Sequence, residues 1–592
     1  MKAITKSEMN VEPSVRGTPW LAPEAWLPPL TMALLMTLLV RMCGLNVPYN
    51  DDFDSPGKMF FDWLQGSFGW HNLWEQHNES RLVIPRLIWL VEAFTVGWST
   101  KHWMYASVLI CALQAYLLAL LLRQLVRHNF LRWLVAICVS LLLLHSQFAP
   151  GTFLRGSQGV ILIPSLFIVF GLFLYSRQIS FRSKLLIYVI LAEISTLTFA
   201  NGMIVWVLLY PIFPILHGLR DSSRDRGGIL LSAALVLFCA LAGIGSYFVN
   251  YGSTPPSWPV DGLAGFLRYF FSLIGAGAGS VGASRANFAF GLCLCVAAVA
   301  CLTFVIMEAV KERTLARVEQ TLPWTALVAY VLVSGVVNTF IRAPLGLTNA
   351  GAERYYLITI QLTVGLAGLL PILVCYRVDG TARRSQEARL ASVGAILLGG
   401  ILFALSGWPN GMARSQQYRR TIMRYRMALS LWAEAPMISP VPTAVALPRR
   451  RTHYLAMVEA GLIPDYSGGL WLTKALQEAQ SREPVGQVHL KGQGVKLRAV
   501  GWAIHPITAM PFPAVLTVLQ GPKSQLTPIS VDLMNQKGPP LPGRLDTNES
   551  AFFMGFSTYP LSRSQKSGSA DRLLFFAIDP ATREAYPLRR NR

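Results

Sequence analysis

Apolar runs long enough to cross a lipid bilayer recur along this chain from about residue 27 to residue 406. A transmembrane helix needs about 20 consecutive, mainly apolar residues, and helices satisfy their own backbone hydrogen bonds inside the bilayer. Of the 592 residues, 53% are hydrophobic and only 14% are charged, whereas soluble proteins carry about 25% charged residues. The sequence therefore predicts a polytopic α-helical membrane protein.

Five short loops between the apolar runs are rich in lysine and arginine. Because loops with an excess of basic residues stay in the cytoplasm, we assign all five to the cytoplasmic side. They lie at residues 123–132, 177–184, 220–226, 311–317 and 377–389. The alternate loops contain few basic residues and are expected to face outward; they lie near residues 149–158, 250–286 and 341–353.

The same loops account for much of the net charge of +21. A nucleic-acid-binding protein gathers its basic residues in one patch interleaved with aromatic residues, whereas many of the basic residues here are spread over separate loops. We therefore expect the protein to contact membrane lipids and not to bind nucleic acid.

The first outer loop, residues 46–102, is expected to contain helices that lie in the membrane interface. Two apolar stretches compete for the next crossing of the bilayer. Residues 103–122 carry no charge, whereas residues 82–98 include Arg86 and Glu92, and charges at bilayer depth are costly. We therefore predict that 103–122 is the second span and that 82–98 forms an interfacial helix. A second interfacial helix is expected near 58–66.

Successive spans must connect loops on opposite sides of the membrane. This requirement also constrains the interpretation of two later stretches. Residues 263–280 are predicted to be interfacial or re-entrant. Residues 185–216 are too long for one span and break at Asn201 and Gly202, so they are predicted to form two spans that meet outside. The expected total is about eleven spans, with the N-terminus in the cytoplasm and the C-terminus outside.

Changes in composition divide the chain into four parts. Residues 1–26 are polar and are expected to be a cytoplasmic segment, with no cleavable signal peptide because no small-residue cleavage site follows the first apolar run. Residues 27–406 form the transmembrane domain, and 407–484 a helical extracytoplasmic connector. Residues 485–592 contain short alternating runs separated by Pro, Gly and Ser, which predicts a small extracytoplasmic β-rich domain resembling a sandwich.

The eight cysteines all lie within or at the ends of apolar runs. They show neither a disulfide framework nor a zinc-ligand spacing, and the simplest interpretation is that they pack as small apolar residues.

Acidic residues are concentrated in the first outer loop. Its beginning, "NVPYNDDFDSPG" (46–57), places Asp51 and Asp52 just after the first span. A run of Asn, Asp, Pro and Gly is also typical of an ordinary turn, and this alternative stays open.

Further polar residues are expected on the same outer face, contributed by loops far apart in the sequence. These candidate substrate-binding or phosphate-binding residues are His77, Asn78, Glu79, Arg81, Arg155, Gln158, Asn201, Arg342, Arg354 and Tyr355. Each also has a structural interpretation, because arginines anchor helices to lipid headgroups, tyrosines line membrane interfaces, and Gln or Asn cap helix ends.

Carboxylates and arginines at one membrane surface have a specific chemical use. A guanidinium group matches the oxygens of a phosphate and stays charged, and a carboxylate can act as a general base on a hydroxyl group. Transfer of a group from a lipid-linked phosphate needs both a base for the acceptor and cations that stabilise the departing phosphate.

These residues resemble the GT-C superfamily of polyprenyl-phosphate-sugar-dependent glycosyltransferases. The segments "WEQHNESRLVIPRLI", "FLRGSQ", "FANGMIVW" and "AGAERYYLI" look like recurring segments of a bacterial branch of that superfamily, and the resemblance covers about residues 27–406. It implies that Asp51 or Asp52 is the catalytic base. It also implies that Arg354, with Arg342 and Tyr355 beside it, binds the donor phosphate.

The resemblance further implies an enzyme in the bacterial inner membrane. It would move a sugar from a polyprenyl-phosphate-linked donor to a cell-envelope glycan or a lipid-linked acceptor on the outer face. Some members hold a divalent metal ion with acids from later outer loops. Here those loops offer only Asp261 and Glu353, so we assign no metal-ligating residues and no other cofactor, and a requirement for a divalent cation stays open.

Two alternatives stay open. The first is an envelope enzyme of the O-antigen ligase or polymerase type, although such proteins place their large polar loop late in the chain. The second is a non-enzymatic transporter or scaffold for lipid-linked glycans. A transporter should show charges at mid-membrane depth and related broken helices, and Glu193 and the break at Asn201 are the only such features.

Overall fold

The computed structural model describes most of the chain. The described residues are 21–49, 51–126, 128–144, 149–221, 226–252, 262–276, 285–312, 315–376, 383–431, 447–464, 472–491, 498–503, 514–520, 526–533, 553–556, 573–579 and 584–591. They form two compact units. We call Met1–Gly44, Trp74–Pro85 and Lys101–Ser415 the bundle unit, and Leu45–Leu73, Arg86–Thr100 and Gln416–Arg592 the tail unit.

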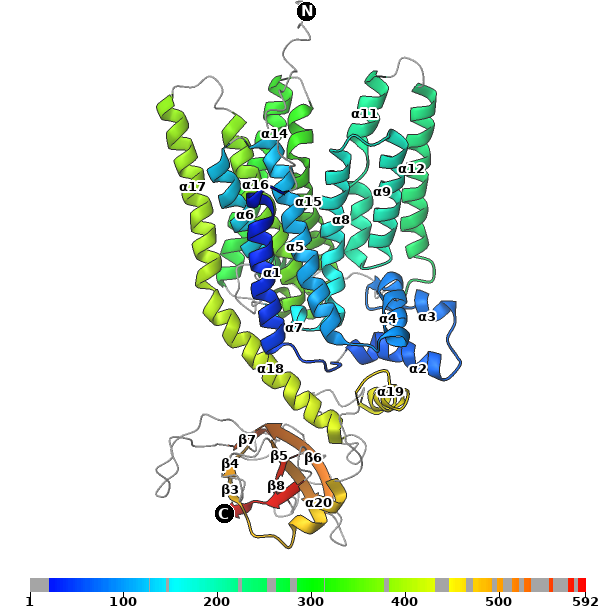
Figure 1. Ribbon diagram of the computed structural model, residues 1–592, viewed down its shortest axis with the longest axis vertical. Coiled ribbons are helices and arrows are strands. Elements are labelled where there is room, and N and C mark those ends of the chain that lie inside the picture. Colours follow the sequence, from blue (N-terminus) through cyan, green and yellow to red (C-terminus); the bar gives the residue numbers. More distant parts are fainter. Residues whose placement is uncertain are drawn as a thin grey trace, which may run out of the picture. The chain divides into compact units, whose positions relative to one another are not determined.

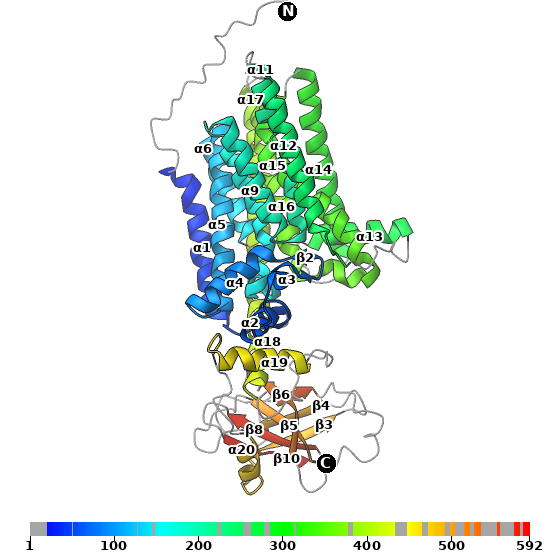
Figure 2. The ribbon, with the colours of Figure 1, turned by 90° about the vertical axis from the view of Figure 1, so that its right-hand side faces the viewer.

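The bundle unit consists of long helices that run side by side (Figures 1 and 2). Its helices are α1 (Pro23–Cys43), α5 (Thr100–Leu125), α6 (Asn129–Leu143), α7 (Pro150–Phe153), α8 (Ile163–Tyr175), α9 (Phe181–Thr196), α10 (Ile204–Leu208), α11 (Ile212–Asp221), α12 (Arg226–Tyr247), α13 (Gly262–Gly275), α14 (Arg285–Glu312), α15 (Ala316–Arg342), α16 (Glu353–Tyr376) and α17 (Arg383–Ser406). Short 3₁₀ turns cover Gly156–Leu162, Ala200–Met203, Ala343–Leu345 and Leu347–Gly351.

Nine helical segments among the described residues are long and apolar enough to cross a membrane. The prediction of a polytopic helical membrane protein is therefore confirmed, while the total of about eleven spans stays a prediction. The helices α6 and α13 are apolar but shorter. The stretch predicted to be interfacial contains α4 (Val83–Thr95), whose 13 residues are too few to cross a bilayer of about 30 Å.

A buried polar contact joins three helices of the bundle unit. The amide of Gln114 on α5 donates to the amide oxygen of Gln361 on α16 at 2.7 Å, and the Ser165 hydroxyl on α8 donates to Gln114 at 3.3 Å. In a bilayer such groups have no water as an alternative partner, so this contact favours one arrangement of the three helices.

The long run of residues 185–216 is interrupted at its predicted break. Helix α9 ends at Thr196, and a 3₁₀ turn, Ala200–Met203, precedes α10. A Cβ atom added at Gly202 would lie 1.9 Å from the carbonyl oxygen of Ser195. Only glycine permits this close approach of two backbones, which explains why the break contains the Asn201–Gly202 pair.

The tail unit contains helices from the first outer loop and from the region after residue 415. Those lying wholly or mainly in it are α2 (Lys58–Leu64), α3 (Trp70–Trp74), α4, α18 (Trp408–Leu431), α19 (Leu447–Glu459) and α20 (Leu472–Ala479), with a π-helical turn at Phe53–Gly57. The tail unit groups loop residues before 101 with residues after 415, and the domain boundaries given above stay a prediction.

Two four-stranded sheets lie at the end of the chain. Their strands are β3 (Gly486–Lys491), β4 (Arg498–Ala503), β5 (Ala514–Gln520), β6 (Leu526–Leu533), β7 (Phe553–Phe556), β8 (Leu573–Asp579), β9 (Glu584–Pro587) and β10 (Arg589–Asn591). The strand orders are β10-β3-β4-β7 and β6-β5-β8-β9. Leu472 and Leu476 of α20 pack against Val518, Phe576 and Ile578 of the second sheet. Sandwich-like packing of the two sheets stays a prediction.

Close packing of α15 against α16 generates a test of the bundle unit. A Cβ atom at Gly368 would lie 1.9 Å from the indole of Trp324, which is fully buried. We expect Gly368→Ala to lower the free energy of unfolding by about 1–3 kcal/mol, because the indole has no space to move into. Thermal unfolding in detergent measures the change.

Gly399→Ala on α17 is the matched control, since nothing lies within 4 Å of the added atom. Equal melting temperatures of the two variants would contradict the close packing described for α15 and α16.

Candidate functional site

A small hairpin carries four of the predicted site residues in the bundle unit. Its strands β1 (Gln76–His77) and β2 (Ser80–Arg81) pair antiparallel, so Asn78 and Glu79 form the turn. Asn78 has φ +51°, a left-handed conformation that asparagine adopts more readily than most residues. The turn presents Glu79 at the tip of the hairpin, and His77 is half-buried beside it.

Arg81 fixes this hairpin to the end of α12. Its guanidinium donates from Nε to the carbonyl oxygen of Tyr247 at 2.7 Å, and from Nη2 to that of Val249 at 2.5 Å. A third bond goes from Nη1 to the carbonyl oxygen of Trp74, whose ring lies 5.2 Å from the guanidinium carbon. Arg81 is only 2% exposed, so its geometry serves to position the hairpin, and substrate binding by Arg81 stays a prediction.

Glu79 connects the hairpin to the end of α15. Its carboxylate forms an ion pair with Arg342, the last residue of that helix. Its main-chain carbonyl accepts hydrogen bonds from the hydroxyls of Tyr247 and Tyr251. Burial raises the pKa of Tyr251, and the charge of Glu79 adds to the effect, so Tyr251 remains a hydrogen-bond donor at neutral pH.

Arg354 lies with two buried tyrosines near this ion pair. Its guanidinium carbon is 5.2 Å from the ring of Tyr355, which packs against Tyr269 of α13. The charges of Arg342 and Arg354 both act on the Tyr269 hydroxyl. We call Glu79, Tyr269, Arg342, Arg354 and Tyr355 the arginine cluster.

Three polar groups of the arginine cluster are buried without a hydrogen-bond partner among the described residues. They are Nε of Arg354 and the hydroxyls of Tyr269 and Tyr355. The two tyrosines are 1% and 5% exposed. A buried donor left unsatisfied costs about 1–3 kcal/mol, and native proteins rarely leave such groups unsatisfied. With two arginines and one carboxylate, the cluster can accept an anion that also takes hydrogen bonds from hydroxyls.

The other predicted residues of the bundle unit lie in turns near helix ends. Arg155 and Gln158 are half-buried, and the main-chain N–H of Gln158 donates to the Arg155 carbonyl oxygen at 3.1 Å. Asn201 is buried beside the hydroxyl of Tyr330. Glu353 accepts a hydrogen bond from the N–H of Gly151 at 2.6 Å, so it ties α7 to α16.

In the tail unit, the two acidic candidates have different surroundings. Asp52 is 1% exposed, and its Oδ2 accepts a hydrogen bond from the N–H of Tyr49 at 2.8 Å. This bond ties the Asp52 carboxylate to the main chain that precedes it. Asp51 is only half-buried and is therefore the more accessible carboxylate.

Helix α19 holds the acidic stretch in place through residues that the sequence analysis did not assign. Arg450 binds Asp54 with two nitrogens, Nε to Oδ1 at 3.2 Å and Nη2 to Oδ2. Burial alone would lower the pKa of Arg450, but its hydrogen bonds to Asp54 and the charges of Asp54 and Asp51 raise it. His453 is buried, and its Nδ1 donates to the Phe53 carbonyl oxygen at 3.0 Å.

The sequence gives little indication of these contacts between α19 and residues 53 and 54. The basic run "RRRTHY" (449–454) stands out in the amphipathic region after residue 412, but nothing local indicates that it meets residues 53 and 54. Tyr269 likewise lies in a mainly apolar run, and nothing local indicates that it meets Tyr355.

The predicted site residues are divided between the two units. Asp51 and Asp52 belong to the tail unit, and Arg342 and Arg354 belong to the bundle unit. Joint action of a carboxylate and the arginines on one substrate therefore stays a prediction. No group of three or more His, Cys, Asp and Glu side chains that could hold a metal ion occurs within the described residues, and Asp261 lies outside them.

Neither the models of known protein families nor the curated proteins contain a match to this chain. The resemblance to the GT-C superfamily therefore stays a prediction based on the residues quoted above.

The buried His453 generates a prediction of pH dependence. Burial lowers the pKa of His453 from its usual value of 6.5, and the positive charge of Arg449 adds to this, against opposing effects of Phe53, Asp62 and Asp54. Below pH 6.5 the unfolded chain therefore binds a proton that the folded chain does not. We expect the melting temperature to be unaffected by His453 above about pH 7 and to fall as the pH is lowered from about 6.5.

His453→Gln keeps a donor that can reach Phe53 but does not titrate. Melting temperatures of the two proteins between pH 5 and pH 8 test the prediction. The prediction is wrong if the melting temperature of the variant falls as much between pH 8 and pH 5 as that of the unsubstituted protein.

Proposed function

We propose that the protein is a membrane glycosyltransferase of the GT-C type in a bacterial inner membrane. It transfers a sugar from a polyprenyl-phosphate-linked donor to a cell-envelope glycan or a lipid-linked acceptor on the outer face. The observation that carries the proposal is the arginine cluster. It combines two cations with buried hydroxyl groups that lack partners among the described residues.

The arginine cluster suits the phosphate of the donor. Arg354 and Arg342 supply positive charge and planar donors that match phosphate oxygens, and the hydroxyls of Tyr269 and Tyr355 can donate to the same oxygens. Negative charge grows on this phosphate as the bond to the sugar breaks, so fixed cations stabilise the transition state. Glu79 pairs with Arg342 and thereby orients its guanidinium group.

The surroundings of the cluster suit a lipid. Tyr269 lies on α13, which also carries the exposed leucines Leu263 and Leu267. Exposed apolar side chains beside a polar, cationic group fit an amphipathic ligand with a charged phosphate and a hydrocarbon chain. The cluster also lies at the helix ends whose loops contain few basic residues, which is the predicted outer end.

Asp51 is the proposed general base. A carboxylate can take the proton of an acceptor hydroxyl as that oxygen attacks the sugar. Asp52 is less suited, because it is buried and its carboxylate already accepts the Tyr49 N–H. The structure thus favours one of the two carboxylates that the sequence left equivalent.

The alternatives from the sequence share the lipid-linked phosphate but differ in chemistry. A transporter or scaffold would bind the lipid-linked sugar without breaking its bond to phosphate. A ligase or polymerase would use a lipid-linked oligosaccharide as donor. A panel of polyprenyl-phosphate monosaccharides and lipid-linked oligosaccharides, offered to the protein in lipid nanodiscs, therefore separates the three.

Substitution of the two aspartates tests the role of the base. We expect Asp51→Asn to lower the transfer rate by about 10²-fold to 10⁴-fold, because the amide cannot accept the proton. Asp52→Asn is the control, since its amide oxygen still accepts the Tyr49 N–H, and its rate should stay within about threefold. Release of radiolabelled sugar measures both rates; an active Asp51→Asn enzyme would contradict the proposed base.

Substitution of an arginine tests the phosphate site separately. Arg354→Gln should lower kcat/KM for the donor by about 10²-fold, because a fixed cation beside the departing phosphate is lost. Arg285→Gln changes an exposed arginine at the start of α14 and should leave kcat/KM unchanged. Equal activity of the two variants would place the donor phosphate elsewhere.

A further inference from the structure

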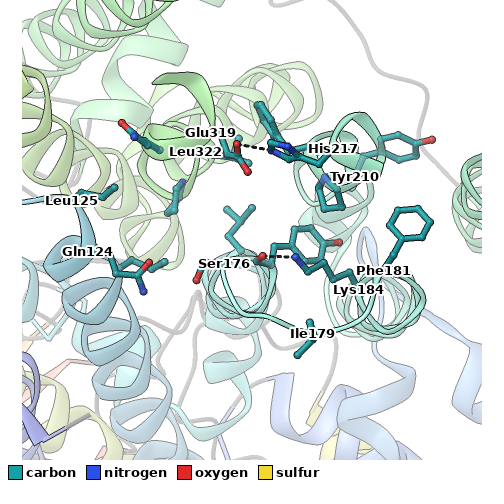
Figure 3. Close-up of a pocket in the computed structure, with 17 residues that line it drawn as sticks. Gln124, Leu125, Ser176, Ile179, Phe181, Lys184, Tyr210, His217, Glu319 and Leu322 are labelled. Carbon is teal, nitrogen blue, oxygen red and sulfur yellow. Dashed lines mark hydrogen bonds and ion pairs between the residues drawn. The ribbon is translucent and has the colours of Figure 1, made fainter. Parts of the chain in front are cut away.

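A cavity lined by both charged and apolar side chains lies in the bundle unit, and none of its residues belongs to the arginine cluster. It measures about 500 Å³ and is formed by the last turns of α5 and α8, the first turns of α9 and α15, and the segment around α11 (Figure 3). These helix ends border the loops at residues 123–132, 177–184, 220–226 and 311–317. The cavity therefore lies at the end of the bundle that the basic loops predict to face the cytoplasm.

Charged groups of both signs line this cavity. Nε2 of His217 on α11 lies 2.9 Å from Oε2 of Glu319 on α15, a hydrogen-bond contact that becomes an ion pair when the histidine is protonated. Lys184 on α9 donates from Nζ to the Tyr175 carbonyl oxygen at 2.8 Å. Glu319 and Lys184 lie close enough for their charges to interact. Figure 3 shows Lys184, His217 and Glu319 around the same space.

Lys184 and Glu319 can each bind more than the partners just described. An ammonium group has three donor hydrogens and a carboxylate has about four acceptor positions. The side chains of Lys184, His217 and Glu319 are half-buried or exposed, so a ligand can reach them.

Apolar side chains also line the cavity, and it lies beside exposed apolar surface. Leu121, Leu172, Phe213 and Leu322 contribute to its walls. The bordering helices expose Leu186 and Ile190 on α9, and Ile212 and Leu216 on α11. A molecule that enters from the bilayer can therefore place a charged group in the cavity and keep its hydrocarbon chain among exposed apolar side chains.

We propose that this cavity binds the headgroup of an aminophospholipid, with its phosphate on Lys184 and its ammonium group on Glu319. A positive and a negative group in one cavity match a headgroup that carries both charges. This lipid site is independent of the proposed transfer reaction, since none of its residues belongs to the arginine cluster.

The same chemistry separates this ligand from related lipids. An anionic headgroup such as phosphatidylglycerol places no cation on Glu319, and its phosphate is repelled by that carboxylate. Phosphatidylcholine has a cation but no N–H to donate, so it loses the hydrogen bonds that strengthen an ion pair. We therefore expect a preference for phosphatidylethanolamine over both.

Native mass spectrometry of the full-length protein tests the preference. Delipidated protein is mixed with dioleoyl-phosphatidylethanolamine, dioleoyl-phosphatidylglycerol or dioleoyl-phosphatidylcholine in equal amounts. One phosphatidylethanolamine should bind at least about fivefold more tightly than either other lipid, as expected when a charge-assisted hydrogen bond is gained. Equal binding of the three lipids, or stronger binding of phosphatidylglycerol, overturns the proposal.

Variants assign the preference to this cavity. Lys184→Gln and Glu319→Gln should each reduce the preference to below about twofold, since each removes one charged partner. Arg182→Gln is the matched control, because Arg182 lies two residues from Lys184, is exposed and does not line the cavity. A preference that survives both cavity substitutions overturns the assignment.

Two further experiments test the site without relying on the variants. A phosphatidylethanolamine with a photoactivatable headgroup, used on unsubstituted protein, should cross-link to one of the helices that line the cavity: α5, α8, α9, α11 or α15. Cross-linking only to other helices overturns the site even if the variants misfold. Soluble glycerophosphoethanolamine should compete only weakly. If it competes as strongly as the lipid, the ligand is a free headgroup and the lipid proposal is wrong.

Discussion

The proposed outer site depends on the burial of one guanidinium group. Arg81 carries a full charge into a site that is 2% exposed, and main-chain carbonyl oxygens of Tyr247, Val249 and Trp74 accept its hydrogen bonds. Hydrogen bonds to a charged group contribute about 1.5–3 kcal/mol each. They fix the hairpin at the end of α12, and the hairpin turn then presents Glu79 to Arg342. The orientation of Arg342 therefore depends on a residue that lies outside the arginine cluster.

The bundle unit has polar sites at both ends of its helices, and they differ in charge. The arginine cluster has two cations and one carboxylate, together with hydroxyls that lack partners among the described residues, so it favours an anion. The cavity near α11 offers the ammonium group of Lys184 and the carboxylate of Glu319, while His217 carries a charge only when it is protonated, so the cavity suits a headgroup with both charges. The buried contact of Gln114 with Gln361 lies in the helices between, where water cannot replace it.

Three neighbouring acidic residues of the tail unit have different surroundings. Asp52 accepts the main-chain N–H of Tyr49, Asp54 is held by Arg450, and Asp51 remains half-buried. Asp51 keeps the accessibility that a general base needs, while its neighbours keep the segment in one conformation.

The sequence by itself determined the polytopic helical class and the break at Asn201 and Gly202. Hydrophobic length and glycine are local properties, so they can be read without knowing any contact. It also identified Arg342, Arg354 and Tyr355 as candidates through their charge and chemistry. Tertiary structure alone decided that Tyr269 joins them, that Arg81 positions a hairpin, and that Asp51 and Asp52 differ. Burial and hydrogen-bond partners decide these roles, and residues distant in the sequence supply many of them, as Tyr247 does for Arg81 and Arg450 for Asp54.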